Sequence, residues 1–280
     1  MAIHVITDSA SDILENEYEN LQILPMTVTF GEYEYQDGLT LGKKEFYEKL
    51  IESDTLPITS QITPFGFEEA ILPYVEAGEQ VLLITLSGKL SGTWQNAAVI
   101  AEDYPNQVYV VDSENASIGQ RILIECALRM IKEEKTIDEI VTELNVIKKK
   151  IHFVALLDTL EYLKKGGRIS KAAAIAGGLL SIKPVIAIEN GEVNVLGKAR
   201  GSKQGNNLIT EQIKKYGEID FSMPYYLAYT GLSDEMIKKY QKDNAHLWEN
   251  EADELPISIV GCAIGTHIGP GAIGVAWIEK

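Results

Sequence analysis

A strand and a hydroxyl-rich turn follow one another in Gln80-Val-Leu-Leu-Ile-Thr-Leu86 and Ser87-Gly-Lys-Leu-Ser-Gly-Thr93. The first run is apolar and β-branched, and it predicts a buried strand over 80–86. In the second run, Ser91 is typical of a helix N-cap and Gly92 allows a close backbone approach. Ligands of α/β sheets bind beyond the carboxyl ends of strands, where helix N-termini favour anions, so a carboxylate fits here. A plain cap and turn is the alternative.

The rest of the first half alternates strands with helices. Further strands are predicted over 3–7, 107–112 and 152–157. A Thr-Pro cap at Thr63 and a capping box at Thr136 predict the starts of helices between them. This alternation predicts a mostly parallel sheet that is covered on both faces.

The second half is mixed. Asn190-Gly191 lies between the apolar runs 184–189 and 192–196 and predicts a tight hairpin, because a type I′ turn needs two positive φ angles. Helices are predicted over 202–216 and 233–248, with a strand at 225–229 and two further strands after them. Parallel and antiparallel pairings should therefore occur together.

The length of 280 residues predicts two modest domains, placed at 1–160 and 161–280. The predicted fold class is α/β, with a mostly parallel α/β N-terminal domain and a mixed α/β C-terminal domain. No Gly/Ser-rich linker separates the halves, so the two domains should pack tightly around a cleft.

Composition excludes several classes of protein. The 25 basic and 41 acidic side chains give a net charge of −16, which argues against binding of nucleic acid or anionic lipid. Cys126 and Cys262 are the only cysteines, too few for a disulfide scaffold or a CxxC metal site. A cytoplasmic location is therefore expected. No export signal is expected before the first strand.

One long uncharged stretch covers 255–278. Glycines, prolines and His267 interrupt it, so it does not match a membrane helix. We expect two buried strands around a glycine-rich loop, and no stable membrane insertion. The glycines around His267 indicate close backbone approach, although a lone histidine is more often a core residue. The other histidines lack metal-ligand spacing, and no metal or cofactor is expected.

Two other polar groups stand out. Thr59 and Ser60 precede the helix cap Thr63, and capping does not account for them, although turn chemistry also favours hydroxyls. The run 164–171 contains four cations, with Gly166 as the C′ residue of one helix and Ser170 as the cap of the next, over 171–182. This basic run is either a solvated face or a patch for an acidic partner or a phosphate, extended in the sequence by Lys198, Arg200 and Lys203.

These segments, in this order, resemble the DegV family of bacterial fatty-acid-binding proteins over nearly the whole chain. Ile62 stands where the family usually has proline after the glutamine. The resemblance is carried by Val5-Ile6-Thr7-Asp8-Ser9, Thr59-Ser60-Gln61, Leu90-Ser91-Gly92-Thr93, Gly166-Gly167-Arg168-Ile169-Ser170 and His267-Ile268-Gly269-Pro270-Gly271.

The resemblance implies two α/β domains with one long-chain fatty acid, such as palmitate or oleate, between them. It also implies a lipid-presenting role in a two-component fatty acid kinase, whose ATP-binding subunit makes acyl phosphate for an acyltransferase of phospholipid synthesis. We expect Thr59, Ser91 and His267 to bind the carboxylate, with a protonated His267 able to stabilise developing charge. Ser60, Gly92, Thr93 and Thr266 would support the loop, and Lys164, Lys165, Arg168 and Arg200 would face the partner or the phosphate.

Two alternatives stay open. A serine hydrolase would use Ser91 as nucleophile and His267 as base, with Asp158 or Asp112 as orienter, but Ser91 lacks the GxSxG elbow. A transport protein would hold fatty acid without any kinase partner. In the leading hypothesis the chain has no stand-alone enzyme activity.

Overall fold

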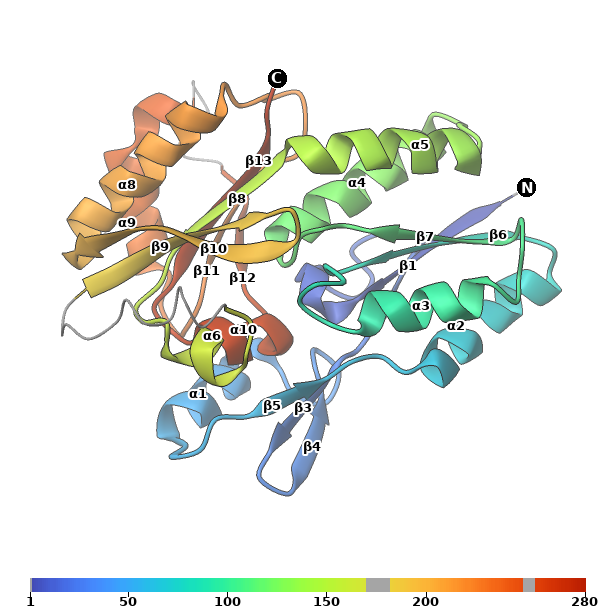
Figure 1. Ribbon diagram of the computed structural model, residues 1–280, viewed down its shortest axis with the longest axis horizontal. Helices are drawn as coiled ribbons and strands as arrows, with labels where there is room; N and C mark the ends of the chain where they lie inside the picture. The colour runs from blue at the N-terminus through green and yellow to red at the C-terminus, as the bar shows by residue number, and fades with distance from the viewer. Residues whose placement is uncertain (1, 170–181, 249–254) are drawn as a thin grey trace.

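The computed structural model describes residues 2–169, 182–248 and 255–280. A four-stranded parallel sheet with the order β2-β1-β6-β7 forms one end of the molecule (Figure 1). The predicted parallel sheet is therefore confirmed. Its strands are β1 (Ile3–Asp8), β2 (Leu21–Leu24), β6 (Gln80–Thr85) and β7 (Val108–Asp112).

Helices cover both faces of this sheet, with α2 and α3 on one side and α4 and α5 on the other (Figure 1). Thr63 and Thr136 cap α2 and α5 as predicted, and Thr136 forms a complete capping box. The four helices are α2 (Pro64–Glu76), α3 (Thr93–Ala101), α4 (Ile118–Lys132) and α5 (Ile137–Ile147).

A second, six-stranded sheet has the order β10-β9-β8-β13-β11-β12. Its pairings are antiparallel except for the parallel β11–β12 pair, so the predicted mixture is confirmed. The strands are β8 (Ile151–Leu156), β9 (Ile182–Glu189), β10 (Glu192–Arg200), β11 (Tyr226–Tyr229), β12 (Ile257–Ile259) and β13 (Ile273–Ile278). Helices α8 (Gly201–Tyr216) and α9 (Glu235–Asp243) pack against it, and α9 ends earlier than predicted, before a short 3₁₀ helix (Ala245–Leu247).

The predicted hairpin joins β9 to β10. Asn190 and Gly191 have φ angles of 51° and 82°, and Glu189 pairs with Glu192 across the turn. Ser87 Oγ donates to the Gly191 carbonyl at 2.8 Å, so the hairpin turn of the second sheet contacts the loop that follows β6 in the first.

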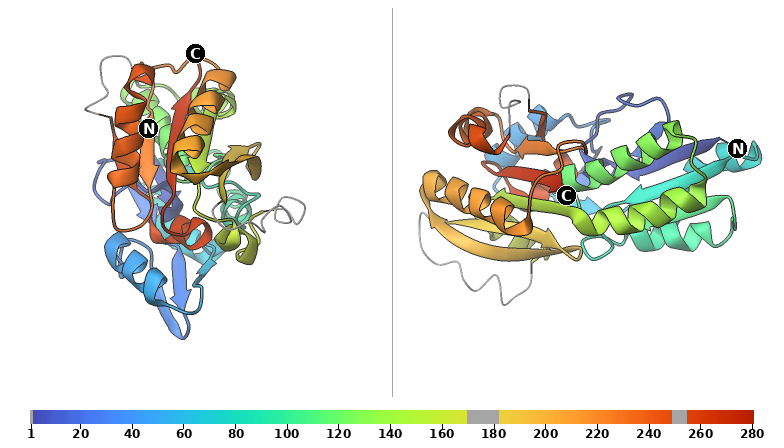
Figure 2. Two further views of the ribbon diagram at one scale, coloured as in Figure 1. Left: turned by 90° about the vertical axis from the view of Figure 1, so that its left-hand side faces the viewer. Right: turned by 90° about the horizontal axis from the view of Figure 1, so that it is seen from above.

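A third, antiparallel sheet was not predicted. It has the order β4-β3-β5 and lies at the bottom of Figure 1, next to α1, α6 and α10. The left view of Figure 2 shows the same small sheet at the lower end of the molecule. Its strands are β3 (Thr27–Phe30), β4 (Tyr33–Gln36) and β5 (Ile58–Ser60), and the helices beside it are α1 (Lys43–Glu52), α6 (Glu161–Lys165) and α10 (Cys262–Ile268); short 3₁₀ helices form over Ser9–Ser11 and Lys148–Lys150.

Two strands, β12 and β13, form within 255–278 as expected, but the glycine-rich segment between them is only partly a loop, because α10 occupies 262–268 and a loop follows over 269–272. The physical reason is non-local: the carboxylate of Asp37, which lies 225 residues earlier, accepts hydrogen bonds from the Cys262 and Ala263 amides. Among the described residues, none of the helices has the length and apolar character that crossing a membrane requires.

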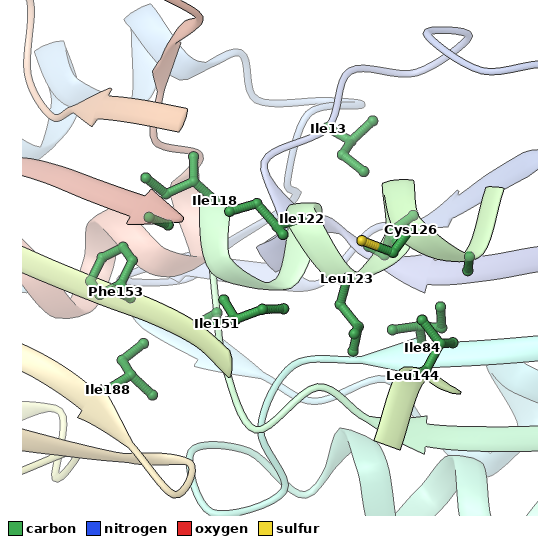
Figure 3. Close-up of a cluster of buried hydrophobic side chains, with 14 of the residues drawn as sticks. Ile13, Ile84, Ile118, Ile122, Leu123, Cys126, Leu144, Ile151, Phe153 and Ile188 are labelled. Atoms are coloured by element: carbon green, nitrogen blue, oxygen red, sulfur yellow. The ribbon is translucent and has the colours of Figure 1, made fainter. Parts of the chain in front are cut away.

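The two large sheets share a core. Figure 3 shows Leu123 of α4 between Ile84 of β6 and Ile151 of β8, and both Leu123 and the neighbouring Ile122 are fully buried. The domain boundary near residue 160 stays a prediction. In the structure β8, which precedes that point, already pairs with β9 and β13 of the second sheet.

Candidate functional site

A cavity of about 330 Å³ lies where the ends of the two large sheets meet α6 and α10. Small-molecule sites are mostly apolar, with a few polar groups that fix orientation, and this cavity has that composition. Its apolar walls come mainly from the second sheet and α6, and they include Phe153, Leu157, Leu163, Ile186, Ile188 and Val193.

Polar groups gather at one part of the wall. Thr59 is the middle residue of β5, and His267 lies in the last turn of α10. A hydrogen bond of 2.8 Å joins Thr59 Oγ1 to His267 Nε2. Ser91 and Ser60 also line the cavity. The structure therefore brings Thr59, Ser91 and His267, which lie far apart in the sequence, to one cavity.

The second ring nitrogen of His267, Nδ1, is buried and has no hydrogen-bond partner in the part of the chain that the structure describes. It lies against the backbone of Gly166, where a Cβ would be 2.3 Å from Nδ1. Burial lowers the pKa of His267 to about 4, and the nearby Arg168 charge contributes to this lowering. In the ligand-free state the His267 ring is therefore neutral at pH 7, and the role of a protonated His267 beside a bound carboxylate stays a prediction.

This lowered pKa predicts acid sensitivity. Unfolded His267 would titrate near 6.5, so between 6.5 and 4 the unfolded state binds more protons than the folded state. The lowered pKa of His267 therefore contributes fully to the free energy of unfolding above pH 6.5. As the pH falls towards 4 this contribution is lost, and the free energy of unfolding decreases by about 3 kcal/mol. In urea unfolding of delipidated protein at pH 7 and 4.5, His267→Gln should lose less stability than wild type. Equal losses would contradict this assignment.

The loop after β6 differs in detail from the prediction. The N-cap of α3 is Gly92, and Ser91 lies one residue earlier. Ser91 Oγ accepts a hydrogen bond from the Thr93 amide at 3.3 Å and contacts Thr93 Oγ1 at 2.9 Å. A Cβ on Gly92 would meet Gln61 Oε1 at 1.9 Å, so glycine lets the loop lie directly against the 59–61 segment.

The hydrogen bonds of the site do not form a hydrolase triad. Ser91 bonds to Thr93, and His267 bonds to Thr59 instead of Ser91. Among the described residues no carboxylate orients the ring, since His267 Nδ1 has no partner there. Within residues 2–169, 182–248 and 255–280, no three His, Cys, Asp or Glu side chains gather as metal ligands.

Arg168 lines the cavity and forms hydrogen bonds both to the loop that follows β6 and to the end of α6. Its Nε donates to the Leu90 carbonyl at 3.0 Å and its Nη1 to the Gly166 carbonyl at 2.6 Å. It follows the end of α6, where Gly167, with φ 71°, is the left-handed residue in place of the expected Gly166. The amides of Gly167 and Arg168 bond back to α6 in a Schellman motif.

The other predicted residues lie outside the cavity wall. Lys164 and Lys165 are exposed at the end of α6, and Arg200 is exposed at the end of β10 away from the hairpin turn. Thr266 donates to the Cys262 carbonyl within α10. Ser170 and the predicted helix over 171–182 fall outside the described residues, apart from Ile182, which begins β9.

Sequence reasoning missed several wall residues. Ser117, at the start of α4, lines the cavity with φ 54° and ψ −136°. Met26 and Ala263 also contribute to the wall. No spacing or motif marks these positions. Gly269, by contrast, confirms the expectation of close approach: it has φ 71°, and a Cβ would lie 2.3 Å from the ring of Tyr162.

Comparisons with known proteins agree over the whole chain. A family model described as "Uncharacterised protein, DegV family" matches residues 2–280. A DegV domain-containing protein of Caldanaerobacter subterraneus is 35% identical, with 99% of each chain covered. A fatty-acid-binding DegV family protein from Thermus thermophilus superimposes with a TM-score of 0.89 at 29% identity, over 100% of both chains. A stearic-acid-binding protein from Eubacterium ventriosum gives 0.88 at 27% identity, covering 100% of this chain and 99% of that one.

Proposed function

This chain belongs to the DegV family, and we propose that it binds one long-chain fatty acid in the cavity, with the carboxylate at Thr59, Ser91 and His267. The observation that carries the proposal is a largely apolar cavity with these three polar side chains in its wall. Structural relatives that are described as binding fatty acids, stearic acid among them, support it.

The chemistry of the wall suits such a ligand. Each CH₂ group removed from water contributes about 0.8 kcal/mol, so apolar walls favour a long alkyl chain. A carboxylate taken out of water costs several kcal/mol unless it is hydrogen-bonded. Thr59 and Ser91 offer hydroxyl donors. The His267 ring is neutral and its Nδ1 has no partner among the described residues, so this nitrogen can donate or accept one further hydrogen bond, depending on the tautomer.

The finer proposal concerns what happens to the bound acid. The chain would present the carboxylate to a separate ATP-dependent kinase subunit, which forms acyl phosphate for phospholipid synthesis. Hydroxyl donors support this role, because they leave a carboxylate oxygen able to attack a γ-phosphate, whereas a bidentate arginine would occupy both oxygens. Arg168 is engaged with Leu90 and Gly166, so Lys164 and Lys165 are the better candidates for contact with the partner.

Charge reversal at Lys164 and Lys165 tests the partner role. The double variant Lys164→Glu/Lys165→Glu should keep its oleate affinity within about twofold, because neither side chain lines the cavity. Acyl phosphate production with the kinase subunit should fall about tenfold, since like charge would oppose docking. Lys238→Glu/Lys239→Glu on α9 is the matched control. Equal production by both double variants would contradict the assignment.

The lipid itself tests the binding function. Protein purified from cells should release a fatty acid of about 16 to 18 carbons on denaturation, identified by mass spectrometry, and delipidated protein should take up oleate or palmitate. Protein that is empty and does not bind either acid at micromolar concentration would refute the proposal. A covalent fluorophosphonate adduct on Ser91 would instead favour a hydrolase, and binding without capture of a kinase subunit would favour a transport role.

A further inference from the structure

The segment 8–12 begins at the last residue of β1; its Asp8 and Ser9 belong to the DegV resemblance, but the segment has no place in the proposed function. In the structure it contacts several parts of the cavity wall. Asp8 accepts a hydrogen bond from the Leu86 amide at 2.8 Å, and Ser9 Oγ accepts one from the Met26 amide at 3.0 Å. Leu86 and Met26 both line the cavity.

Asp12 joins the start of α10 to the start of α4. Its Oδ1 accepts a hydrogen bond from the Gly261 amide at 2.6 Å, at the N-cap of α10. Its Oδ2 accepts one from the Ser117 hydroxyl, at the start of α4. Ser117 holds φ 54°, a conformation that favours glycine, and its amide is fixed by the Ala10 carbonyl at 2.8 Å.

Asp37 completes the attachment of α10. Its two carboxylate oxygens accept hydrogen bonds from the Cys262 and Ala263 amides at 2.9 and 3.0 Å. The Ser9 hydroxyl donates to the same carboxylate at 3.0 Å. Lys43 lies beside them and donates to the Asp12 and Ile259 carbonyls.

The first turn of helix α10 is therefore hydrogen-bonded to two buried carboxylates, and its last turn contains His267. The helix has seven residues, and Ala263, Ile264, His267 and Ile268 all line the cavity. No side chain within α10 or at its N-cap supplies a capping hydrogen bond. A shift of its first turn would move His267 relative to Thr59, which is held separately in the third sheet.

We propose that Asp12 and Asp37 are positioning residues for the fatty-acid site, because their carboxylates fix the first turn of α10 and thereby the place where His267 meets Thr59. This inference rests on the proposed function for its ligand. The geometry predicts different tolerance at the two positions. The side-chain amide introduced by Asp12→Asn could accept from Gly261 and donate to Ser117 Oγ. The amide introduced by Asp37→Asn would instead present an NH₂ group to one of the α10 backbone amides.

The experiment compares Asp12→Ala, Asp12→Asn and Asp37→Asn in the full chain. Two measurements are made: oleate affinity of delipidated protein, and the ¹⁵N shifts and titration of the His267 imidazole in the ligand-free state. Asp12→Ala and Asp37→Asn should weaken oleate binding about tenfold or more and shift the His267 signals. Asp12→Asn should bind oleate within about threefold of the wild-type affinity and should keep the wild-type His267 signals, with no loss of thermal stability.

Three outcomes would contradict the inference. Wild-type affinity and His267 signals in both Asp12→Ala and Asp37→Asn would overturn it, as would an Asp12→Asn variant as weak as Asp12→Ala. If Asp12→Ala does not fold, Asp37→Asn must still bind more weakly than Asp12→Asn. If wild type itself binds no oleate, the proposed function fails, while the His267 signals still report whether the two carboxylates position the ring.

Discussion

Replacement of Thr59 by valine should weaken oleate binding about 10- to 100-fold, because a hydrogen bond to a charged group contributes about 1.5–3 kcal/mol. Valine keeps the shape of threonine and removes only the hydroxyl. In this structure the loss also deprives His267 Nε2 of its partner, which leaves both ring nitrogens unpaired. The measurement is titration of delipidated protein with oleate.

Thr29→Val is the matched control for this prediction. Thr29 lies on β3 of the same small sheet, paired with the neighbour of Thr59, and it does not line the cavity. The control should bind oleate as wild type does. Equal affinity of the Thr59 and Thr29 variants would show that the hydroxyl of Thr59 does not bind the carboxylate.

Replacement of Gly166 by alanine should have an effect of similar size through a different cause. Gly166 has φ −73°, which alanine adopts without strain, but the added Cβ would lie 2.3 Å from His267 Nδ1. Either the ring or the end of α6 must move by about 1 Å, and a displacement of that size in a positioned site costs up to about 100-fold. Oleate affinity should therefore fall while the fold is retained.

Gly66→Ala separates this steric effect from a general effect of replacing glycine. Gly66 lies within α2, and its added Cβ would make ordinary contacts at 3.4 Å or more. This variant should bind oleate normally and unfold at an equal or higher temperature, because alanine favours helix. A Gly166→Ala variant with wild-type affinity would mean that His267 does not need its present position.

Local chemistry explains which parts of the fold were predictable. Asn190-Gly191 predicts its hairpin because both residues accept positive φ, and Thr136 predicts a helix start because its capping partner lies three residues away. Helix α10 is different. It is short, contains Gly265, and is capped by Asp37 from 225 residues away, so no window of the sequence contains the cause of the helix.

In the site, as in the fold, some features could be predicted from the sequence and others depend on distant contacts. The family resemblance selected Thr59, Ser91 and His267, and the structure places all three in one cavity wall. The direction in which Arg168 points could not be predicted, because its acceptors are the backbone carbonyls of Leu90 and Gly166. Ser117 has no sequence signal at all, since its unusual backbone depends on Asp12 and Ala10.

The strand order of the large mixed sheet has a consequence for synthesis of the chain. Strand β13 follows every other strand in sequence, yet it lies between β8 and β11. Until the ribosome has released it, β10-β9-β8 and β11-β12 have no strand to join them, whereas the parallel sheet is complete once β7 has emerged. A nascent chain can therefore pair the strands of its first half early, whereas the proposed fatty-acid site, whose wall includes residues of the second sheet, can be complete only after β13 has emerged.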